Sequence, residues 1–452
     1  MSQDPVPELL RRATEQLDAE FADLPDPGPD LDADPAAMAA VLETVAHRLG
    51  DNYPYFHPLY AGQMLKPPHP VARAAYALAM KINPNNHARD GGRASSEMEI
   101  EAVREIAAMF GWTDFLGHLT SSGTLANLEA LWIAGQLAPG KRIVGSAQAH
   151  YTHRRISAVL KLDYAEIASD SLGRMSLESL ENELRKGDVG TVVVTLGTTA
   201  IGAVDPLDEI LKLKARYGFR VHVDAAYGGY FRLIAGHLDE PARRAYLATA
   251  EADSLVIDPH KHGLQPYGCG CVVFRDPAVG RFYKHDSPYT YFTSSQLHLG
   301  EISLECSRAG AAAVALWATQ RLLPLTAGGE FARGLKSGRA AALELVRRLR
   351  ADRRFGLLTS EAPELDIAVW MLNAESAERA SDMAQEIFVA CATRGLHLAL
   401  VQLPLFWFQP SAGTQAGAVT CLRSVLMKPE HERWLDRIWE RFSAGCAESL
   451  GV

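Results

Sequence analysis

The sequence has few cysteines, no block of basic residues and no apolar run long enough to cross a membrane. Its six cysteines are scattered, and Cys269 and Cys271 stand close together without a second pair at zinc-finger spacing. This usage argues against a disulfide framework and favours free thiols in a reducing, cytoplasmic compartment. The net charge of −9 argues against a nucleic-acid partner. The N-terminus, MSQDPVPELL, lacks the pattern of a signal peptide, so we expect no membrane association.

The remaining composition is that of an ordinary folded protein, with 48% hydrophobic and 22% charged residues. A chain of 452 residues is long enough for one large and one small domain. Residues 1–60 are predicted to form a helical arm, because two helical patterns flank the breaker at 24–29. Residues 61–328 carry buried strands and helices and are predicted to form the large domain. Residues 329–452 mix helices and strands in the manner of a small α+β domain.

Two short β-branched runs end abruptly in polar residues. The first is Val221–Val223, which ends at Asp224, and the second is Ser254–Ile257, which is followed by Asp258 and Lys261. Buried parallel strands have this pattern, and ligands bind at their carboxyl ends in open α/β sheets. An acid and a lysine that converge there suggest a site for pyridoxal 5'-phosphate. In such a site the lysine forms a Schiff base and the acid pairs with the pyridine nitrogen.

Two further segments are typical of the same kind of sheet edge. Residues Leu119–Thr124 place small hydroxyl residues and glycine before the helical pattern Leu125–Leu137. A helix start of this kind either is a plain N-cap or binds an anion through its free N–H groups. The run TVVVTL at 191–196 is predicted to be a buried strand. With the helix that ends at Gly218 and the strand that ends at Asp224, it makes a right-handed βαβ unit.

Several histidines near these segments raise the question of a metal site. They are His150, His153, His222, His260 and His262. Their spacing never gives H-E-x-x-H or a comparable set of ligands on one face, so we expect no metal.

The paired motifs HVDAAYGG at 222–229 and DPHK at 258–261 resemble those of the pyridoxal-phosphate-dependent group II amino-acid decarboxylases. This family includes aromatic amino-acid, glutamate, tyrosine and histidine decarboxylases, and the similarity covers the chain from about His57 to the C-terminus. The resemblance implies an α/β fold of fold type I. Such a fold has a mostly parallel seven-stranded sheet in the large domain, a small C-terminal α+β domain and an N-terminal helical arm. The resemblance also implies a homodimer with active sites at the subunit interface.

The resemblance further implies roles for individual residues. Lys261 carries the cofactor, Asp224 keeps the pyridine nitrogen protonated, and His150 stacks on the ring. The other implied cofactor contacts are Ser122, Gly123 and Thr124 at the phosphate, with Thr199, Ala226, Asp258 and His260 nearby. For Thr199 a simple turn hydroxyl is the alternative. Tyr289 and Tyr291 lie in a polar, aromatic stretch and are candidates for the tyrosine that protonates the substrate carbon, reaching into the neighbouring subunit's site.

Decarboxylation of an L-amino acid to its amine and CO₂ is the activity that the resemblance implies. The alternatives are another reaction of the same cofactor, such as carbon–carbon lysis, transamination or decarboxylating aldehyde synthesis, an acidic amino-acid substrate, or a catalytically silent binding protein. An aromatic substrate is favoured because aromatic residues are expected around the pocket: Tyr60, Tyr289, Phe406, Trp407 and Phe408. Gln63 is a further candidate for substrate contact. Arg423 is expected to meet either a substrate carboxylate or a structural acid.

Overall fold

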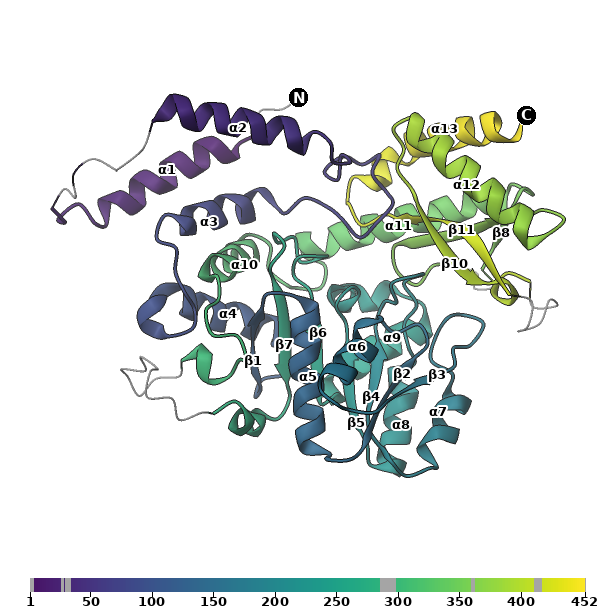
Figure 1. The fold of residues 1–452 in the computed structure, drawn as a ribbon, viewed down its shortest axis with the longest axis horizontal. Helices are drawn as coiled ribbons and strands as arrows, with labels where there is room; N and C mark the ends of the chain where they lie inside the picture. The colour runs from purple at the N-terminus through teal and green to yellow at the C-terminus, as the bar shows by residue number, and fades with distance from the viewer. Residues whose placement is uncertain are drawn as a thin grey trace.

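The computed structural model describes residues 4–25, 28, 34–284, 298–358, 362–409 and 417–451. Within these ranges the chain forms a helical N-terminal region, a seven-stranded sheet with helices packed on it, and a four-stranded sheet (Figure 1). The smaller sheet and its helices lie at the upper right of Figure 1. No described helix combines the length and the apolarity needed to cross a bilayer.

Helices make up most of the described chain that precedes the large sheet. They are α1 (Val6–Ala19), α2 (Pro35–Leu49), α3 (Pro70–Met80) and α4 (Arg93–Met109). Asp34 caps α2 by accepting the N–H of Ala36, and Pro35 occupies the first helical position. Helix α1 contacts α3, and both α3 and α4 contact α10 (Gly310–Leu322). No residue of α1 or α2 is buried, so these two helices add little to the core.

The large sheet carries the strand ends singled out by the sequence. Its strands are β1 (Leu116–Thr120), β2 (Arg142–Ser146), β3 (Tyr164–Ile167), β4 (Val189–Thr195), β5 (Arg220–Asp224), β6 (Ser254–Ile257) and β7 (Gly270–Phe274). Their order is β1-β7-β6-β5-β4-β2-β3, and β7 runs antiparallel to both of its neighbours. The pairs from β3 through β2, β4 and β5 to β6 are parallel. The predicted, mostly parallel seven-stranded sheet is therefore confirmed.

The helices of the large sheet are α5 (Gly123–Leu137), α6 (Thr152–Val159), α7 (Leu177–Leu184), α8 (Leu207–Tyr217) and α9 (Glu240–Leu247). Strand β4 has both faces covered, since Val192, Val193 and Val194 are all 0% exposed. This explains why it is a continuous apolar run instead of an alternating one. Helix α8 connects β4 to β5 and stops at Gly218, whose φ of 73° is readily adopted by glycine.

The small sheet is antiparallel. Its strands are β8 (Phe355–Leu357), β9 (Ile367–Leu372), β10 (Ala399–Pro404) and β11 (Ala418–Val425), in the order β10-β11-β9-β8. Its helices are α11 (Glu330–Arg350), α12 (Ala377–Thr393) and α13 (His431–Leu450). Helix α11 contacts β8 and β9, while α12 contacts β9, β10 and β11. This arrangement confirms the predicted α+β character of the C-terminal part.

Candidate active site

The ends of β4, β5 and β6 and the start of α5 line an open pocket with about 430 Å³ of empty space, adjoining solvent included. Cα pairing puts Thr195 opposite Asp224, and Asp224 opposite Val256, so the three strand ends are in register. The lining residues are Gly123, Thr124, Asn127, His150, Thr152, Thr195, Gly197, Thr199, Asp224, Ala226, Tyr227, Asp258 and Lys261. All the cofactor-site residues predicted from the sequence except Ser122 and His260 are in this set.

Asp224 is the buried acid of the pocket, and its carboxylate is held on both oxygens. His153 Nε2 lies 2.7 Å from Oδ2, and the backbone N–H of Ala226 donates to Oδ1 at 3.1 Å. Burial raises the pKa of Asp224, but the hydrogen bond from His153 and the charge of Lys261 outweigh burial and hold this pKa well below its usual value. The carboxylate is therefore ionised at neutral pH, which a partner for a protonated ring nitrogen requires.

Lys261 follows β6 and is paired with an acid three residues before it. Its Nζ lies 2.9 Å from Asp258 Oδ2. Burial lowers the pKa of Lys261, but Asp258 and the more distant Asp224 raise it above its ordinary value overall. The amine is therefore protonated at neutral pH. A covalent bond from this nitrogen to an aldehyde requires the proton to leave first, and Asp258 is the acid that contacts it.

The start of α5 forms a narrow cradle beside Asp258. The Leu125 N–H donates to Ser122 Oγ at 3.2 Å, so Ser122 caps the helix. Gly123 comes so close to Asp258 that a Cβ at this position would stand 2.4 Å from Oδ1, so any other residue here would displace the Asp258 carboxylate. Gly123 and Thr124 line the pocket, where the free N–H groups of the helix start and the helix dipole favour an anion such as a phosphate.

The pocket suits a cofactor that carries a phosphate, an aldehyde and a basic ring nitrogen. The helix start offers an anion site, Lys261 offers an amine, and Asp224 offers a carboxylate. Two buried pocket atoms, Thr195 Oγ1 and Asp258 Oδ1, have no hydrogen-bond partner among the described residues. Buried polar atoms are rarely left without partners, so these atoms indicate room for a polar ligand. The residues present therefore fit pyridoxal phosphate.

His150 lines the pocket opposite the strand ends and is held by its neighbours. Its Nδ1 lies 2.8 Å from Thr152 Oγ1, and the ring of Tyr151 lies 4.4 Å from its own ring, centroid to centroid. Burial lowers the pKa of His150, which favours a neutral imidazole at pH 7. A neutral ring fixed in this way is able to stack on a flat ligand.

Some predicted residues lie elsewhere. Ser122 and His260 do not line the pocket: Ser122 uses its hydroxyl to cap α5, and His260 Nδ1 lies 2.7 Å from the carbonyl oxygen of Cys269. The His260 ring packs on Tyr267, with centroids 4.8 Å apart. Tyr289 and Tyr291 lie outside the described residues.

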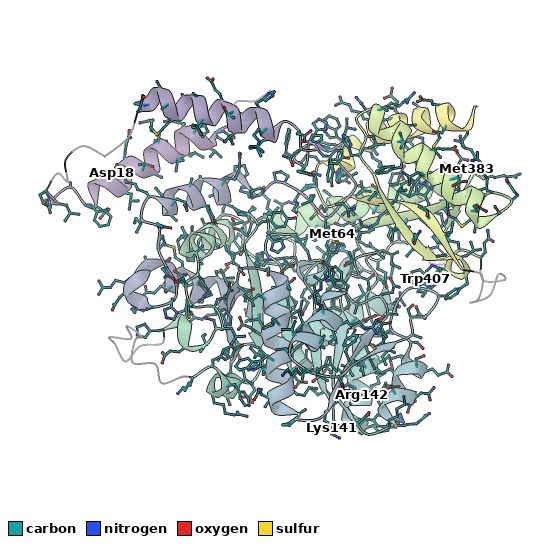
Figure 2. All side chains as sticks on the ribbon, in the orientation of Figure 1. Asp18, Met64, Lys141, Arg142, Met383 and Trp407 are labelled. Atoms are coloured by element: carbon teal, nitrogen blue, oxygen red, sulfur yellow. The ribbon has the colours of Figure 1, made fainter. Side chains whose placement is uncertain are left out.

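The aromatic residues expected around the pocket are not among the described residues that line it. Tyr60, Phe406, Trp407 and Phe408 do not line the pocket. Trp407 lies beside the small sheet (Figure 2). It is 0% exposed and packs against Gly173, where a Cβ would stand 3.1 Å from its Cη2. Tyr60 is also buried, and its ring centroid lies 4.9 Å from that of Tyr55. Tyr60 and Trp407 belong to the core, and Phe406 and Phe408 are partly buried against it.

Arg423 was expected to meet either a substrate carboxylate or a structural acid. In the structure its guanidinium donates to three backbone carbonyl oxygens and one side-chain amide oxygen. Its Nη2 donates to the carbonyl of Thr199 at 2.7 Å and its Nε to that of Ala200 at 2.9 Å. Its Nη1 donates to the carbonyl of Gly62 at 3.3 Å and to Gln63 Oε1 at 3.1 Å. The guanidinium therefore ties β11 to the loop after β4 and to the segment that carries Gln63.

Sequence reasoning missed several pocket residues. His153 reaches Asp224, and Asn127, Thr152, Thr195 and Tyr227 line the pocket. The position of His153, only three residues after His150, was a usable signal. The contact between positions 153 and 224 spans 71 residues and has no counterpart in local sequence. Among the described residues, no group of three or more His, Cys, Asp or Glu side chains is arranged to hold a metal ion.

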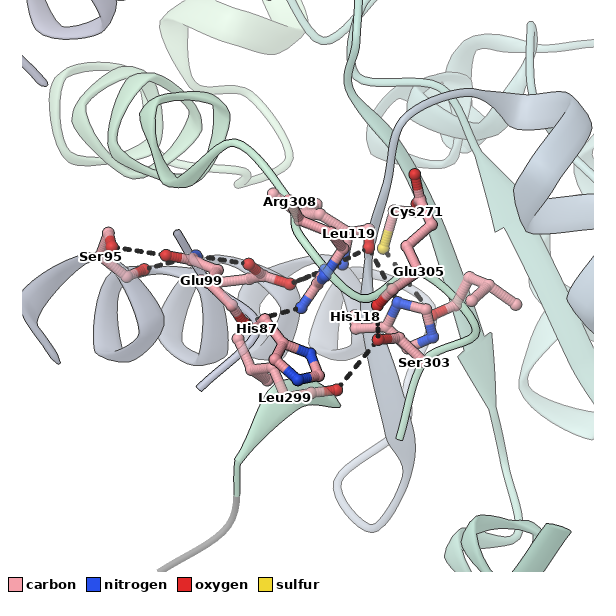
Figure 3. Close-up of polar contacts among 12 residues, drawn as sticks. His87, Ser95, Glu99, His118, Leu119, Cys271, Leu299, Ser303, Glu305 and Arg308 are labelled. Atoms are coloured by element: carbon pink, nitrogen blue, oxygen red, sulfur yellow. Dashed lines mark hydrogen bonds and ion pairs between the residues drawn. The ribbon is translucent and has the colours of Figure 1, made fainter. Parts of the chain in front are cut away.

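A buried polar network supports the strand that leads into the cradle (Figure 3). Arg308 Nη1 donates to Glu99 Oε1 at 2.7 Å and to the carbonyl of Leu119 at 2.5 Å, while the Leu119 N–H donates to the same Glu99 oxygen at 2.9 Å. The Ser121 N–H donates to Glu305 Oε2 at 2.9 Å. The segment 298–308 therefore holds β1 and the turn before α5 in place.

Comparison with known proteins agrees with this geometry. Residues 7–370 match the pyridoxal-dependent decarboxylase conserved domain. The chain is 28% identical to L-tyrosine decarboxylase of Enterococcus faecium over 67% of this chain and 66% of that protein, so it spans less than two thirds of that relative's length. It is 36% identical to L-2,4-diaminobutyrate decarboxylase of Rhizobium meliloti over 46% of this chain and 44% of that protein.

The fold has been seen before. The crystal structure of mouse CSAD superposes with a TM-score of 0.77 at 22% identity, covering 97% of this chain and 91% of that chain. At this identity the likeness establishes the fold and nothing finer. The match to the conserved domain, in contrast, runs from α1 to β9 and includes both Asp224 and Lys261. The chain therefore belongs to the pyridoxal-dependent decarboxylase family.

Proposed function

We propose that the protein removes the α-carboxylate of an L-amino acid as CO₂, with pyridoxal phosphate bound between Asp224 and Lys261. The observation that carries this proposal is that the acid at the end of β5 and the lysine after β6 line one pocket, beside an open helix start. When bound, pyridoxal phosphate supplies an electron sink for the pair of electrons that the departing CO₂ leaves behind. The protein contributes binding, orientation and proton transfers.

Each pocket residue then has a physical task. Lys261 is the attachment point for the cofactor, and Asp258 accepts the proton that its amine must lose. Asp224 holds a proton on the ring nitrogen, because its ionised carboxylate stabilises the positive charge there. The start of α5 at Gly123 and Thr124 binds the phosphate, and His150 packs on the ring face. The source of the proton that replaces CO₂ is proposed to be Tyr289 or Tyr291, from the neighbouring subunit.

For the substrate we favour an aromatic L-amino acid, with tyrosine as the first choice. Lys261 is the one cationic side chain among the described lining residues, and Arg423 is engaged by four oxygens. Apart from Lys261, the described lining residues therefore offer no cation for a second substrate carboxylate, which disfavours aspartate and glutamate. The likeness to a tyrosine decarboxylase points the same way, while the likeness to a diaminobutyrate decarboxylase names the competing substrate to be tested.

The test is to incubate the purified protein and pyridoxal phosphate with each of the twenty common amino acids and with 2,4-diaminobutyrate. We expect CO₂ and the matching amine in equal amounts, with tyrosine turned over fastest. Ammonia or peroxide in amounts equal to CO₂ would identify an aldehyde synthase instead. Turnover without CO₂ would indicate carbon–carbon lysis or transamination. If no substrate is turned over, the protein would be a catalytically silent binding protein.

We also propose that the protein is a homodimer, because α2 presents an apolar stripe to solvent. Met38, Val41, Leu42, Val45 and Leu49 follow the spacing of one helix face and are 50%, 62%, 65%, 45% and 62% exposed. A helix with no buried residue and such a stripe needs a partner surface to be stable. A second copy of the chain is the partner that the family resemblance implies. The cytoplasmic location expected from the cysteines stays a prediction.

Replacing Leu42 and Val45 together by aspartate is expected to convert the dimer to a monomer, because two charges then lie in the apolar contact. Sedimentation velocity at micromolar protein concentration measures the change. Glu43→Gln alters a neighbouring residue of α2 outside the stripe and is expected to leave the dimer intact. A wild-type monomer, or a double variant that stays dimeric, would contradict the proposed role of α2.

A further inference from the structure

His153 is the one described side chain that donates a hydrogen bond to the carboxylate of Asp224. It lies in the first turn of α6 and is 0% exposed, and its Nε2 is 2.7 Å from Asp224 Oδ2. Its other ring nitrogen, Nδ1, is buried and has no hydrogen-bond partner among the described residues. Because Asp224 is an acceptor, the proton must be on Nε2. The ring therefore has a single polar contact, and that contact is to the acid of the pocket.

Neighbouring groups are not able to take over this contact. The ring of His222 lies 6.3 Å from that of His153, but its Nε2 is 2.8 Å from Asn127 Oδ1 and its Nδ1 is 2.9 Å from Ser254 Oγ. The backbone N–H of Ala226 holds Oδ1 and not Oδ2. Without His153, the described chain offers Oδ2 of this buried carboxylate no other donor, and only the backbone N–H of Ala226 would restrain rotation about the Cβ–Cγ bond.

We propose that His153 is a positioning residue, whose Nε2–H fixes the Asp224 carboxylate in the orientation that receives the ring nitrogen of the cofactor. The inference rests on the proposed function, since it concerns the same pocket. A hydrogen bond to a buried charged group is stronger than one between neutral groups, and this one has two effects on the pocket. It keeps Asp224 ionised, and it removes the need to order the carboxylate when the cofactor binds.

The side chain at position 153 is tested with two replacements of different hydrogen-bonding ability. His153→Phe keeps a planar ring without a donor, and His153→Gln places an amide N–H near the position of Nε2. We expect the phenylalanine variant to bind pyridoxal phosphate about tenfold more weakly and to lose kcat with little change in KM, since the lost contact orients the cofactor and not the substrate. The glutamine variant is expected to recover most of both losses.

Equilibrium dialysis gives the dissociation constant of pyridoxal phosphate without any turnover. His118→Phe is the matched control, because His118 Nε2 pairs with Glu129 Oε2 at 3.0 Å, both side chains are fully buried, and neither lines the pocket. It is expected to lower the melting temperature without changing the dissociation constant. If His153→Phe does not fold, His153→Asn replaces it, because the shorter amide does not reach Asp224.

The outcomes separate this inference from the proposed function. Wild-type affinity and kcat in a folded His153→Phe protein would overturn the positioning role while leaving the function intact. A glutamine variant no better than the phenylalanine variant would also overturn it. If the wild-type protein itself does not bind pyridoxal phosphate, the proposed function is wrong, and the role of His153 that rests on it is wrong as well.

Discussion

A Lys261→Ala protein, dialysed after pyridoxal phosphate is added, is expected to lack the imine absorption band that the wild-type protein shows. The imine absorbs at longer wavelength than the free aldehyde, and Lys261 carries the one amine among the described residues of the pocket. Turnover is expected to fall by at least about 10²- to 10⁴-fold, the contribution typical of a positioned proton-transfer group alone. An absorption spectrum between 300 and 500 nm, and amine formation, measure the two effects.

The surroundings of Lys261 call for a second variant and a surface control. Removing Lys261 leaves Asp258 without the ammonium that lies 2.9 Å from its Oδ2, so Lys261→Met, which keeps the bulk of the side chain, should accompany the alanine variant. Lys212→Ala is the control, because Lys212 is 69% exposed and pairs with Glu209 on the surface of α8. An active Lys261→Ala protein that keeps the imine band would mean that the cofactor is attached at another residue, and the assignment of the pocket would be wrong.

The residues at the strand ends were predictable from sequence because their environment is local. Asp224 and Lys261 each stand where a β-branched run breaks into polar residues, and a buried strand requires such a run. Gly123 was predictable for the same reason, because a helix start that binds an anion must leave its backbone uncovered. Parallel pairing then brings these ends together without further information, since all parallel strands end at the same edge.

The errors concern side chains whose partners come from distant parts of the chain. Trp407 and its neighbours form an apolar run, and such a run occurs both in protein cores and in the walls of pockets. The sequence alone does not distinguish the two locations. Arg423 was expected to meet a carboxylate, yet four uncharged oxygens from two loops satisfy it. His153 was noted only as part of a histidine set, because its acceptor lies 71 residues away.

Replacing Asp224 by alanine is expected to leave some cofactor binding and to remove nearly all turnover. Lys261 and the start of α5 still hold the cofactor, but the ring nitrogen loses the ionised partner that stabilises its proton, and the ring becomes a poor electron sink. Breaking a buried charge pair costs about 3–5 kcal/mol, which corresponds to a rate loss of roughly 10²- to 10⁴-fold. Single-turnover measurements with saturating cofactor separate this loss from weaker binding.

Asp224→Asn is the more exacting variant, because it keeps the size of the side chain and removes only the charge. If the carboxylate acts through its charge, the asparagine variant should be as inactive as the alanine variant, within about tenfold. Asp253→Asn is the matched control: Asp253 precedes β6 at the opposite edge of the sheet, where it accepts the N–H of Val221 at 2.7 Å and pairs with Lys214 at 2.7 Å. That change is expected to lower stability and spare turnover. Near-normal activity in Asp224→Asn would mean that the ring nitrogen needs no ionised partner, and the acid at the end of β5 would then have only a structural role.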